Sequence, residues 1–306
     1  MGRAAGRGEA IAAMSDGLAF FLIQVLNGVQ EGLLLFLVAS GLTLVFGIMG
    51  IINLAHGSFY MLGAYLVYAL ASFTGDLWTA ILIAVPLAIV LGLALEALLI
   101  RPLYGRDHLY QVLLTYGLIL VLEEIRSLLF GDDVHGVAVP AFLDFSIPLK
   151  DALTYPAYRL FLSALCLAIA GAMWWLIRYT RLGMAIRAGS TNREMVQSLG
   201  IDIAWIYRAV FALGVALAAL AGMIAAPAAS VFPGMGNDVL IVSFVVVVIG
   251  GIGSIKGAFL GALLVGLADT FGQIYVPQLS GMTIYVLMAA VLLWRPAGLF
   301  GRAGAG

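Results

Sequence analysis

The stretch Gly41–Tyr65, GLTLVFGIMGIINLAHGSFYMLGAY, reads as a membrane helix that is broken halfway. Its two flanks are apolar, and between them stand Gly50, Asn53, His56, Gly57 and Ser58. A bilayer offers the backbone no hydrogen-bond partners, so such an interruption is stable only where protein buries it or where it lines a wet cavity. Transporters place substrate sites at breaks of this kind. The stretch therefore predicts a path through a membrane.

The composition places the whole chain in a membrane. Of its 306 residues, 63% are hydrophobic and 10% are charged, whereas about 25% are charged in ordinary soluble domains. The fold class that follows is an all-α polytopic membrane protein. The net charge of -1 and the scattered basic residues give no face for nucleic acid. The single cysteine, Cys166, excludes a disulfide or CxxC site within the chain and is expected to be a packing residue.

The apolar runs define the domain organisation. We expect residues 1–17, rich in Gly, Ala and Arg, to be disordered, with Met14 as an alternative start, and residues 18–300 to form one transmembrane domain. Ten apolar segments are predicted, at 18–39, 41–53, 57–73, 79–100, 110–130, 157–178, 207–230, 239–255, 257–276 and 282–296. If the segments that meet near His56 and those that meet at Lys256 each form one bent unit, the count falls to eight.

The distribution of basic residues predicts the orientation. Short cytoplasmic loops are enriched in Lys and Arg. With ten crossings, one side of the membrane receives all the basic clusters: Arg3, Arg7, Arg101, Arg106, Arg178, Arg181, Arg187, Arg193, Lys256, Arg295 and Arg302. The loop 131–156, with four aspartates, then lies outside. Eight crossings put the amino terminus and the basic tail outside, so the rule favours ten.

The two unusual junctions resemble one another at an offset of 200 residues. Five identities carry the match: Val45 and Val245, Gly50 and Gly250, Ile52 and Ile252, Gly57 and Gly257, Phe59 and Phe259. Paired glycine-interrupted segments are typical of internal transporter repeats, although Gly-rich apolar helices also match by chance. Small residues at four-residue spacing, Gly214, Ala218 and Gly222, then Gly257 and Gly261, predict close helix packing.

The longest cytoplasmic loop, 179–206, contains the second informative stretch, RLGMAIRAGSTNREMVQSLGID (Arg181–Asp202). Thr191 with Glu194 fits a capping box, and Gly200 fits a left-handed C-terminal position. Between them Met195, Val196 and Leu199 form one apolar stripe on a short helix. Such a face suits either a cytoplasmic ATPase subunit or the protein's own membrane domain and the lipid surface.

From about Phe20 to Phe300 the chain resembles the branched-chain amino acid ABC transporter permeases, the LivH type. Three stretches carry the resemblance: FGIMGIINLAHGSFYMLGAY (Phe46–Tyr65), the loop RLGMAIRAGSTNREMVQSLGID, and GGIGSIKGAFLGALLVG (Gly250–Gly266). Many relatives carry an acidic residue after the His-Gly pair, where this chain has Ser58. Relatives of similar sequence import amides or urea, so the substrate stays open between these and branched-chain amino acids.

The resemblance implies a multi-pass permease subunit of a bacterial inner-membrane importer. Its implied partners are a second homologous permease, two cytoplasmic ATPase subunits and an extracytoplasmic binding protein. The partner subunits would use ATP and Mg, and this chain would bind no cofactor. The resemblance makes the short helix the ATPase-coupling helix, with Arg187, Thr191, Glu194, Met195, Val196, Leu199 and Gly200 as its residues.

Polar residues within apolar segments are candidates for the translocation path, because a polar solute must exchange water for hydrogen-bonding groups. The candidates are Asn27, Gln30, Asn53, His56, Gly57 and Ser58. His56 is expected to be neutral and bonded to backbone that the break frees. Asn53 and Ser58 are the favoured lining residues, with capping of the broken helix as their alternative. Glu31, Glu123 and Glu124 either line the path, or sit near helix ends or pair with Arg126.

Two other classes of function fit less well. An intramembrane enzyme needs a nucleophile with a base or a metal cluster, but the three histidines are scattered and no HExxH occurs, so no catalytic or metal site is predicted. A stand-alone secondary transporter fits the composition and the breaks, and transport without ATP would support it. The chain has no phosphate-binding loop, since Gly251–Lys256 lacks the GK[ST] ending.

Overall fold

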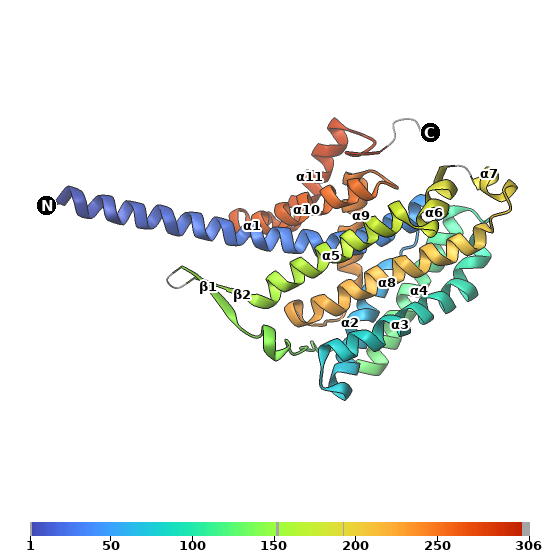
Figure 1. Cartoon of the computed structure of the whole chain (residues 1–306), viewed down its shortest axis with the longest axis horizontal. Helices are drawn as coiled ribbons and strands as arrows, with labels where there is room; N and C mark the ends of the chain where they lie inside the picture. The colour runs from blue at the N-terminus through green and yellow to red at the C-terminus, as the bar shows by residue number, and fades with distance from the viewer. Residues whose placement is uncertain (1, 151–152, 192, 302–306) are drawn as a thin grey trace.

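The computed structural model describes residues 2–150, 153–191 and 193–301, and the side chains within these ranges except those of residues 2–16, 149, 150, 153, 191, 193 and 194. Apart from one small hairpin, the described chain is a bundle of helices (Figure 1). The longer helices are α1 (Gly2–Met49), α2 (His56–Thr74), α3 (Leu77–Leu95), α4 (His108–Phe130), α5 (Ala157–Tyr179), α8 (Ile203–Ala229), α9 (Met235–Gly250), α10 (Ile255–Tyr275) and α11 (Ser280–Trp294).

Short elements join these helices. A π-turn (Glu96–Ile100) and a 3-10 turn (Arg101–Leu103) extend α3, and further 3-10 turns cover Ala141–Leu143 and Pro277–Leu279. Strands β1 (Ser146–Lys150) and β2 (Leu153–Pro156) pair antiparallel before α5. Helices α6 (Arg181–Thr191) and α7 (Arg193–Ser198) fill the predicted loop 179–206.

The predicted fold class is confirmed. In the described part of the chain six helices are long and apolar enough to cross a membrane, and α9 is a shorter apolar helix. Among residues 2–150, 153–191 and 193–301 the structure has nine helices of 15 or more residues, which falls within the predicted eight to ten segments. Both predicted glycine-interrupted junctions are present, one between α1 and α2 and the other between α9 and α10.

The predicted separation of segments 18–39 and 41–53 is wrong, because residues 18–49 lie in the continuous helix α1. The polar residues there do not break the helix. Ser40 donates its hydroxyl to the carbonyl of Leu37 at 2.9 Å, so its polar group is satisfied locally. Gly41 faces Gly214 of α8, where an added Cβ would lie 2.9 Å from a carbonyl oxygen. Gly41 is therefore a packing glycine.

The continuity of α1 also changes the predicted orientation. In Figure 1, α1 begins on the side of the β1–β2 hairpin and ends near α6. The last turn of α1 lies against the α9–α10 turn, where Gly47 meets Gly253. Leu299 and Phe300 donate their backbone N–H groups to the carbonyls of Ile249 and Gly250 in the same region. We call this the basic end, since it carries the loops with Arg101, Arg181 and Arg295. The start of α1, with Arg3 and Arg7, is on the opposite side, the hairpin end. The prediction that they lie with the other basic residues is wrong.

Residues 2–17, for which the sequence predicts disorder, form the first turns of α1, and this part of the helix projects beyond the other helices in Figure 1. A helix without tertiary packing is marginal in water. The disorder of this segment in solution stays a prediction.

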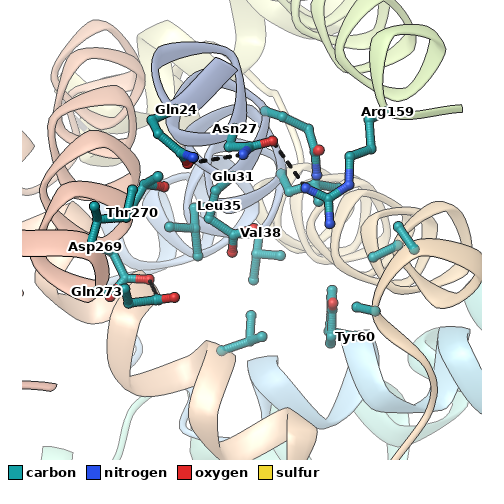
Figure 2. Close-up of a pocket in the computed structure, with 17 residues that line it drawn as sticks. Gln24, Asn27, Glu31, Leu35, Val38, Tyr60, Arg159, Asp269, Thr270 and Gln273 are labelled. Atoms are coloured by element: carbon teal, nitrogen blue, oxygen red, sulfur yellow. Dashed lines mark hydrogen bonds between the residues drawn. The ribbon is translucent and has the colours of Figure 1, made fainter. Parts of the chain in front are cut away.

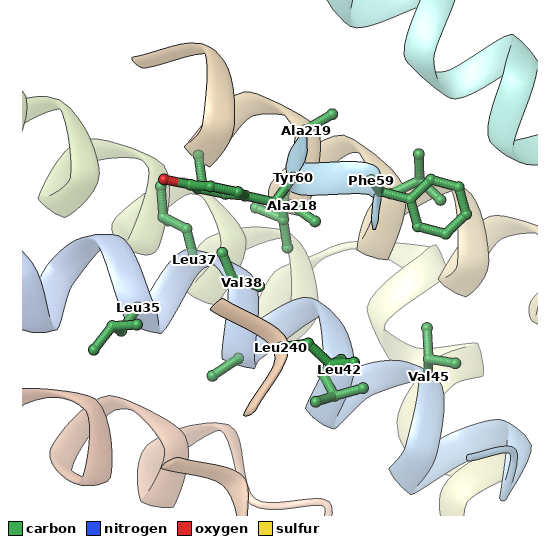
Figure 3. Packing of buried hydrophobic residues seen from close by; sticks show 14 of the residues in the cluster. Leu35, Leu37, Val38, Leu42, Val45, Phe59, Tyr60, Ala218, Ala219 and Leu240 are labelled. Carbon is green, nitrogen blue, oxygen red and sulfur yellow. The ribbon is translucent and has the colours of Figure 1, made fainter. Parts of the chain in front are cut away.

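Glycines set the distances between the central helices. Between α2 and α8, an added Cβ at Gly222 would lie 2.0 Å from the carbonyl oxygen of Tyr60, and one at Gly63 would lie 2.1 Å from that of Ala219. Between α1 and α10, one at Gly266 would lie 2.3 Å from the backbone nitrogen of Gly32. The predicted packing role of the small residues is confirmed, and a core of buried apolar side chains fills the space between these helices (Figure 3).

The two junctions share a local pattern but differ in packing. Each ends a helix at a glycine of positive φ, Gly50 at 67° and Gly251 at 95°, and each has a tightly packed glycine at the start of the next helix. Gly257 touches Gly250, so α9 and α10 form a hairpin, whereas Gly57 touches Gly236 of α9 rather than α1. The two turns thus share a glycine pattern, and the internal repeat stays a prediction.

We expect Gly222→Ala to lower the stability of the protein by about 1–3 kcal/mol, because the added methyl has no room beside the Tyr60 carbonyl. The thermal unfolding midpoint in detergent measures this. Gly117→Ala in α4 is the matched control, since nothing lies within 4 Å of its added Cβ. Equal midpoints for the two variants would contradict the tight α2–α8 contact.

Candidate functional site

Between α1 and α2, side chains bond the backbone groups that have no helical hydrogen-bond partner. After Gly50 the chain runs without helix until His56. The Asn53 carbonyl Oδ1 accepts from the Ala55 N–H at 3.1 Å, and the Leu54 N–H donates to Thr115 Oγ1 of α4 at 3.3 Å. These bonds replace those that a helix would make. Within the described chain, the Asn53 amide nitrogen is buried without a hydrogen-bond partner.

His56 ties the start of α2 to the middle of α1. Its Nε2 lies 3.1 Å from the carbonyl oxygen of Val38, and the ring is buried. A carbonyl can only accept, so this contact requires the tautomer that carries its proton on Nε2. Val38 belongs to the helix interior, so the expected bond to backbone freed by the break is replaced by a bond between two helices.

A cavity of about 410 Å³ lies beside this junction. Side chains of α1, α5 and α10 supply its polar wall, and α2, α8 and α9 supply most of the rest (Figure 2). The lining residues are Gln24, Asn27, Gln30, Glu31, Leu34, Leu35, Val38, Tyr60, Arg159, Ala225, Ala228, Ala229, Val239, Asp269, Thr270, Gln273 and Ile274. Its size suits a small solute.

The cavity separates the six predicted path residues into two groups. Asn27 and Gln30 line it. Asn53, His56 and Ser58 are buried in the packed junction, and an added Cβ on Gly57 would lie 2.1 Å from the Gly236 carbonyl oxygen. In this structure Asn53 holds the break, its alternative role, and the four junction residues are not among those that line the cavity.

Asn27 is the centre of a hydrogen-bond network. Its Oδ1 accepts from Arg159 Nη1 at 3.0 Å and from the Tyr155 hydroxyl at 3.1 Å, and its Nδ2 donates to Gln24 at 3.2 Å. Across the cavity Gln273 Nε2 donates to Asp269 Oδ2 at 2.8 Å. Two of the three ionisable side chains of the cavity wall, Arg159 and Asp269, are therefore held by hydrogen bonds to amide side chains (Figure 2).

Sequence reasoning missed Arg159, Asp269 and Gln273. The signal was available, because Arg159 stands near the start of the apolar run 157–178 and Asp269 stands inside the run 257–276. An ionisable residue in a membrane segment marks a functional site by default. Glu31, for which two roles were open, lies on the cavity wall rather than at the end of a helix.

Glu123 pairs with Arg126, one of the two roles that the sequence left open for it. Arg126 pairs with Glu123 at 3.3 Å and with Asp132 at 2.9 Å, and it also donates to the Gly131 carbonyl. Hydrogen bonds from Arg126 and Ser127 hold the pKa of the Asp132 carboxyl below its usual value. This cluster fastens the end of α4 to the loop that follows.

The predicted coupling stretch is helical at the basic end. Gly200 has a φ of 79°, as predicted for its left-handed position. The apolar stripe is split, because Val196 is 3% exposed whereas Met195 and Leu199 are 62% and 72% exposed. Arg187 donates to the Ile177 carbonyl at the end of α5. The side chains of Thr191 and Glu194 lie outside the described residues, so the capping box stays a prediction.

We expect Asn53→Ala to destabilise the protein by about 1–2 kcal/mol, because it removes the acceptor for the buried Ala55 N–H. Thermal unfolding in detergent measures the effect. Ser72→Ala, which removes an exposed side-chain bond to a backbone carbonyl in the same helix as His56, is the control. An unchanged midpoint for Asn53→Ala would show that the break does not depend on this bond.

Comparisons with known proteins agree with this architecture. The family described as "Branched-chain amino acid transport system / permease component" matches residues 24–292. The permease protein BraD of Pseudomonas aeruginosa is 31% identical, over 92% of this chain and 96% of that protein. LivH of Escherichia coli K12 is 31% identical over 94% of this chain and 98% of LivH.

A second type of permease protein is also similar. LivM of Escherichia coli K12 is 29% identical over 85% of this chain and 66% of LivM. BraD, LivH and LivM are each named a high-affinity branched-chain amino acid transport system permease protein. Together with the apolar helices, these matches identify a multi-pass protein of the bacterial membrane. The chain belongs to the family of branched-chain amino acid transport system permease components.

Proposed function

We propose that this chain is one of two membrane subunits of an ATP-driven importer for branched-chain or related amino acids. The observation that carries the proposal is the polar cavity between α1, α5 and α10 in a chain of this permease family. The names of BraD and LivH, which refer to branched-chain amino acid transport, support the substrate class. The similarity to both LivH and LivM supports a second, homologous permease as partner.

In this importer an extracytoplasmic binding protein delivers the solute to the hairpin end, and two ATPase subunits bind at the basic end. The positive-inside rule supports this assignment of the two ends. The partner subunits bind ATP and Mg, because the chain lacks a phosphate-binding loop ending in GK[ST]. The chain supplies the passage and no cofactor of its own.

The coupling role rests on α7 and the turn that follows it. The exposed Met195 of α7 and the exposed Leu199, directly after α7, lie at the basic end beside a groove that Tyr104, Gln197 and Tyr207 help to line. Val196 packs inward and anchors the helix to the membrane domain. An exposed apolar pair on an anchored helix suits a protein partner that moves this helix.

Uptake by the complete complex in proteoliposomes tests the function. With the binding protein added outside and ATP enclosed with the ATPase subunits, we expect accumulation of labelled L-leucine. Uptake of urea or acetamide instead of L-leucine would favour an amide importer of the same family. L-Leucine uptake without ATP would favour a secondary transporter. Either of these results would overturn the proposal.

We expect the double variant Met195→Asp/Leu199→Asp to lose the ATPase subunits on copurification in mild detergent, because two carboxylates replace an apolar contact. The yield of ATPase per permease measures this. The control is Leu279→Asp, an exposed apolar residue that precedes α11. Full copurification and ATP-driven uptake with the double variant would refute the docking role of α7.

A further inference from the structure

The cavity wall carries charges of both signs on separate helices. Arg159 projects from α5, Glu31 from α1 and Asp269 from α10 (Figure 2). In this view Arg159 lies on one side of the cavity and Asp269 with Gln273 on the other. Placing a charged side chain in a membrane domain costs free energy. Three ionisable side chains around one cavity therefore indicate a functional site.

These charges do not neutralise one another by direct contact. No ion pair joins Arg159 to Glu31 or Asp269 in the part of the chain that the structure describes. Arg159 bonds the neutral amide of Asn27, and Asp269 bonds the neutral amide of Gln273. The printed hydrogen bonds of Arg159 and Asp269 thus go to uncharged amides, which leaves both charges available to a solute in the cavity.

An unsatisfied polar atom also points to a ligand. Gln30 lines the cavity and is only 6% exposed, and its Oε1 is buried without a partner among the described residues. Native proteins rarely leave such an atom unpaired, because burial without a hydrogen bond costs free energy. A donor on a bound solute would satisfy it.

The rest of the wall is apolar. Leu34, Leu35, Val38 and Val239 line it together with small alanines of α8. An aliphatic side chain of a solute can be buried against these apolar groups, and the polar end of the same solute can contact the ionisable side chains of α1, α5 and α10. The cavity thus combines a cationic side, an anionic side and an apolar wall.

We propose that this cavity binds a zwitterionic α-amino acid, with Arg159 at its carboxylate, Glu31 and Asp269 at its ammonium group, and the apolar wall around its side chain. This inference rests on the proposed function and deepens it, because it separates amino acids from amides and urea. A neutral amide would leave both signs of charge without an ionic partner, which makes its entry less favourable.

Protection of an engineered cysteine tests the binding site without relying on the binding protein. Thr270 lines the cavity, and Cys166, the one native cysteine, is buried outside it. In the complete complex carrying Thr270→Cys and Cys166→Ala, we measure the rate of labelling by a water-soluble thiol reagent. At about ten times its dissociation constant, L-leucine should slow labelling about tenfold. Leucinamide lacks the carboxylate and 4-methylpentanoate lacks the ammonium group, so each should protect less than L-leucine at equal concentration.

Charge-removing variants assign the two sides. Arg159→Gln should weaken L-leucine protection and lower ATP-driven uptake by about tenfold or more, because it removes a charge-assisted bond. Glu31→Gln and Asp269→Asn should have the same effect through the ammonium group. Two matched controls should keep both readouts: Arg178→Gln, at the far end of α5, and Glu124→Gln, an exposed residue of α4.

The outcomes separate the inference from the proposed function. ATP-driven L-leucine uptake with selective L-leucine protection, lost in the three cavity variants, supports both. Uptake with equal protection by all three solutes, with no protection, or with unchanged cavity variants overturns the zwitterion site and leaves the importer intact. Absence of ATP-driven L-leucine uptake by the unmodified complex overturns the proposed function, and the inference with it. The solute comparison uses no charge variant, so a misfolded variant does not decide the result.

Discussion

Close approach of helix backbones is the constraint on which the rest of this structure depends. In a bilayer the hydrophobic effect does not drive helices together, so packing must do so. Gly63 and Gly222 bring α2 against α8, and Gly28, Gly32 and Gly266 bring α1 against α10. At several of these contacts a single methyl group would meet backbone atoms. The positions of the junction and of the cavity follow from these contacts, because α1, α2, α8 and α10 all contribute to the cavity wall.

The junction and the cavity have separate tasks. The junction is packed and its hydrogen bonds are largely made within the protein, through Asn53, Thr115 and His56. The junction positions two residues of the cavity wall. His56 bonds the carbonyl of Val38, and Tyr60, one turn further along α2, lines the cavity together with Val38. A polar interruption in a membrane helix here serves to start a helix at the right depth, and the polar solute site lies beside it.

Much of the fold could be read from the sequence, and less of the site. The two glycine-interrupted junctions, small-residue packing on α8 and the left-handed Gly200 are local signals, and each was predicted, although the glycine of positive φ at the second junction is Gly251 rather than Gly250, the predicted counterpart of Gly50. The continuity of α1 was not predicted, because the sequence does not show whether a residue pair such as Ser40 and Gly41 interrupts a helix or packs it against another helix. The cavity joins Asn27 to Arg159 and Asp269, residues more than 100 positions apart. Sequence periodicity gives no information on such pairs, so of the six predicted path residues only Asn27 and Gln30, both in α1, line the cavity.

The hairpin before α5 has a consequence for the electrostatics of the cavity. Tyr155 of β2 donates its hydroxyl to Asn27 Oδ1, the same oxygen that accepts from Arg159. One acceptor atom therefore serves both a surface strand and a charged group of the cavity. If the strand withdraws its hydroxyl, the oxygen holds the guanidinium alone and attracts it more strongly, which reduces the positive potential that a solute meets. The shared oxygen thus links the position of the hairpin to the electrostatic potential in the cavity, with no helix movement required.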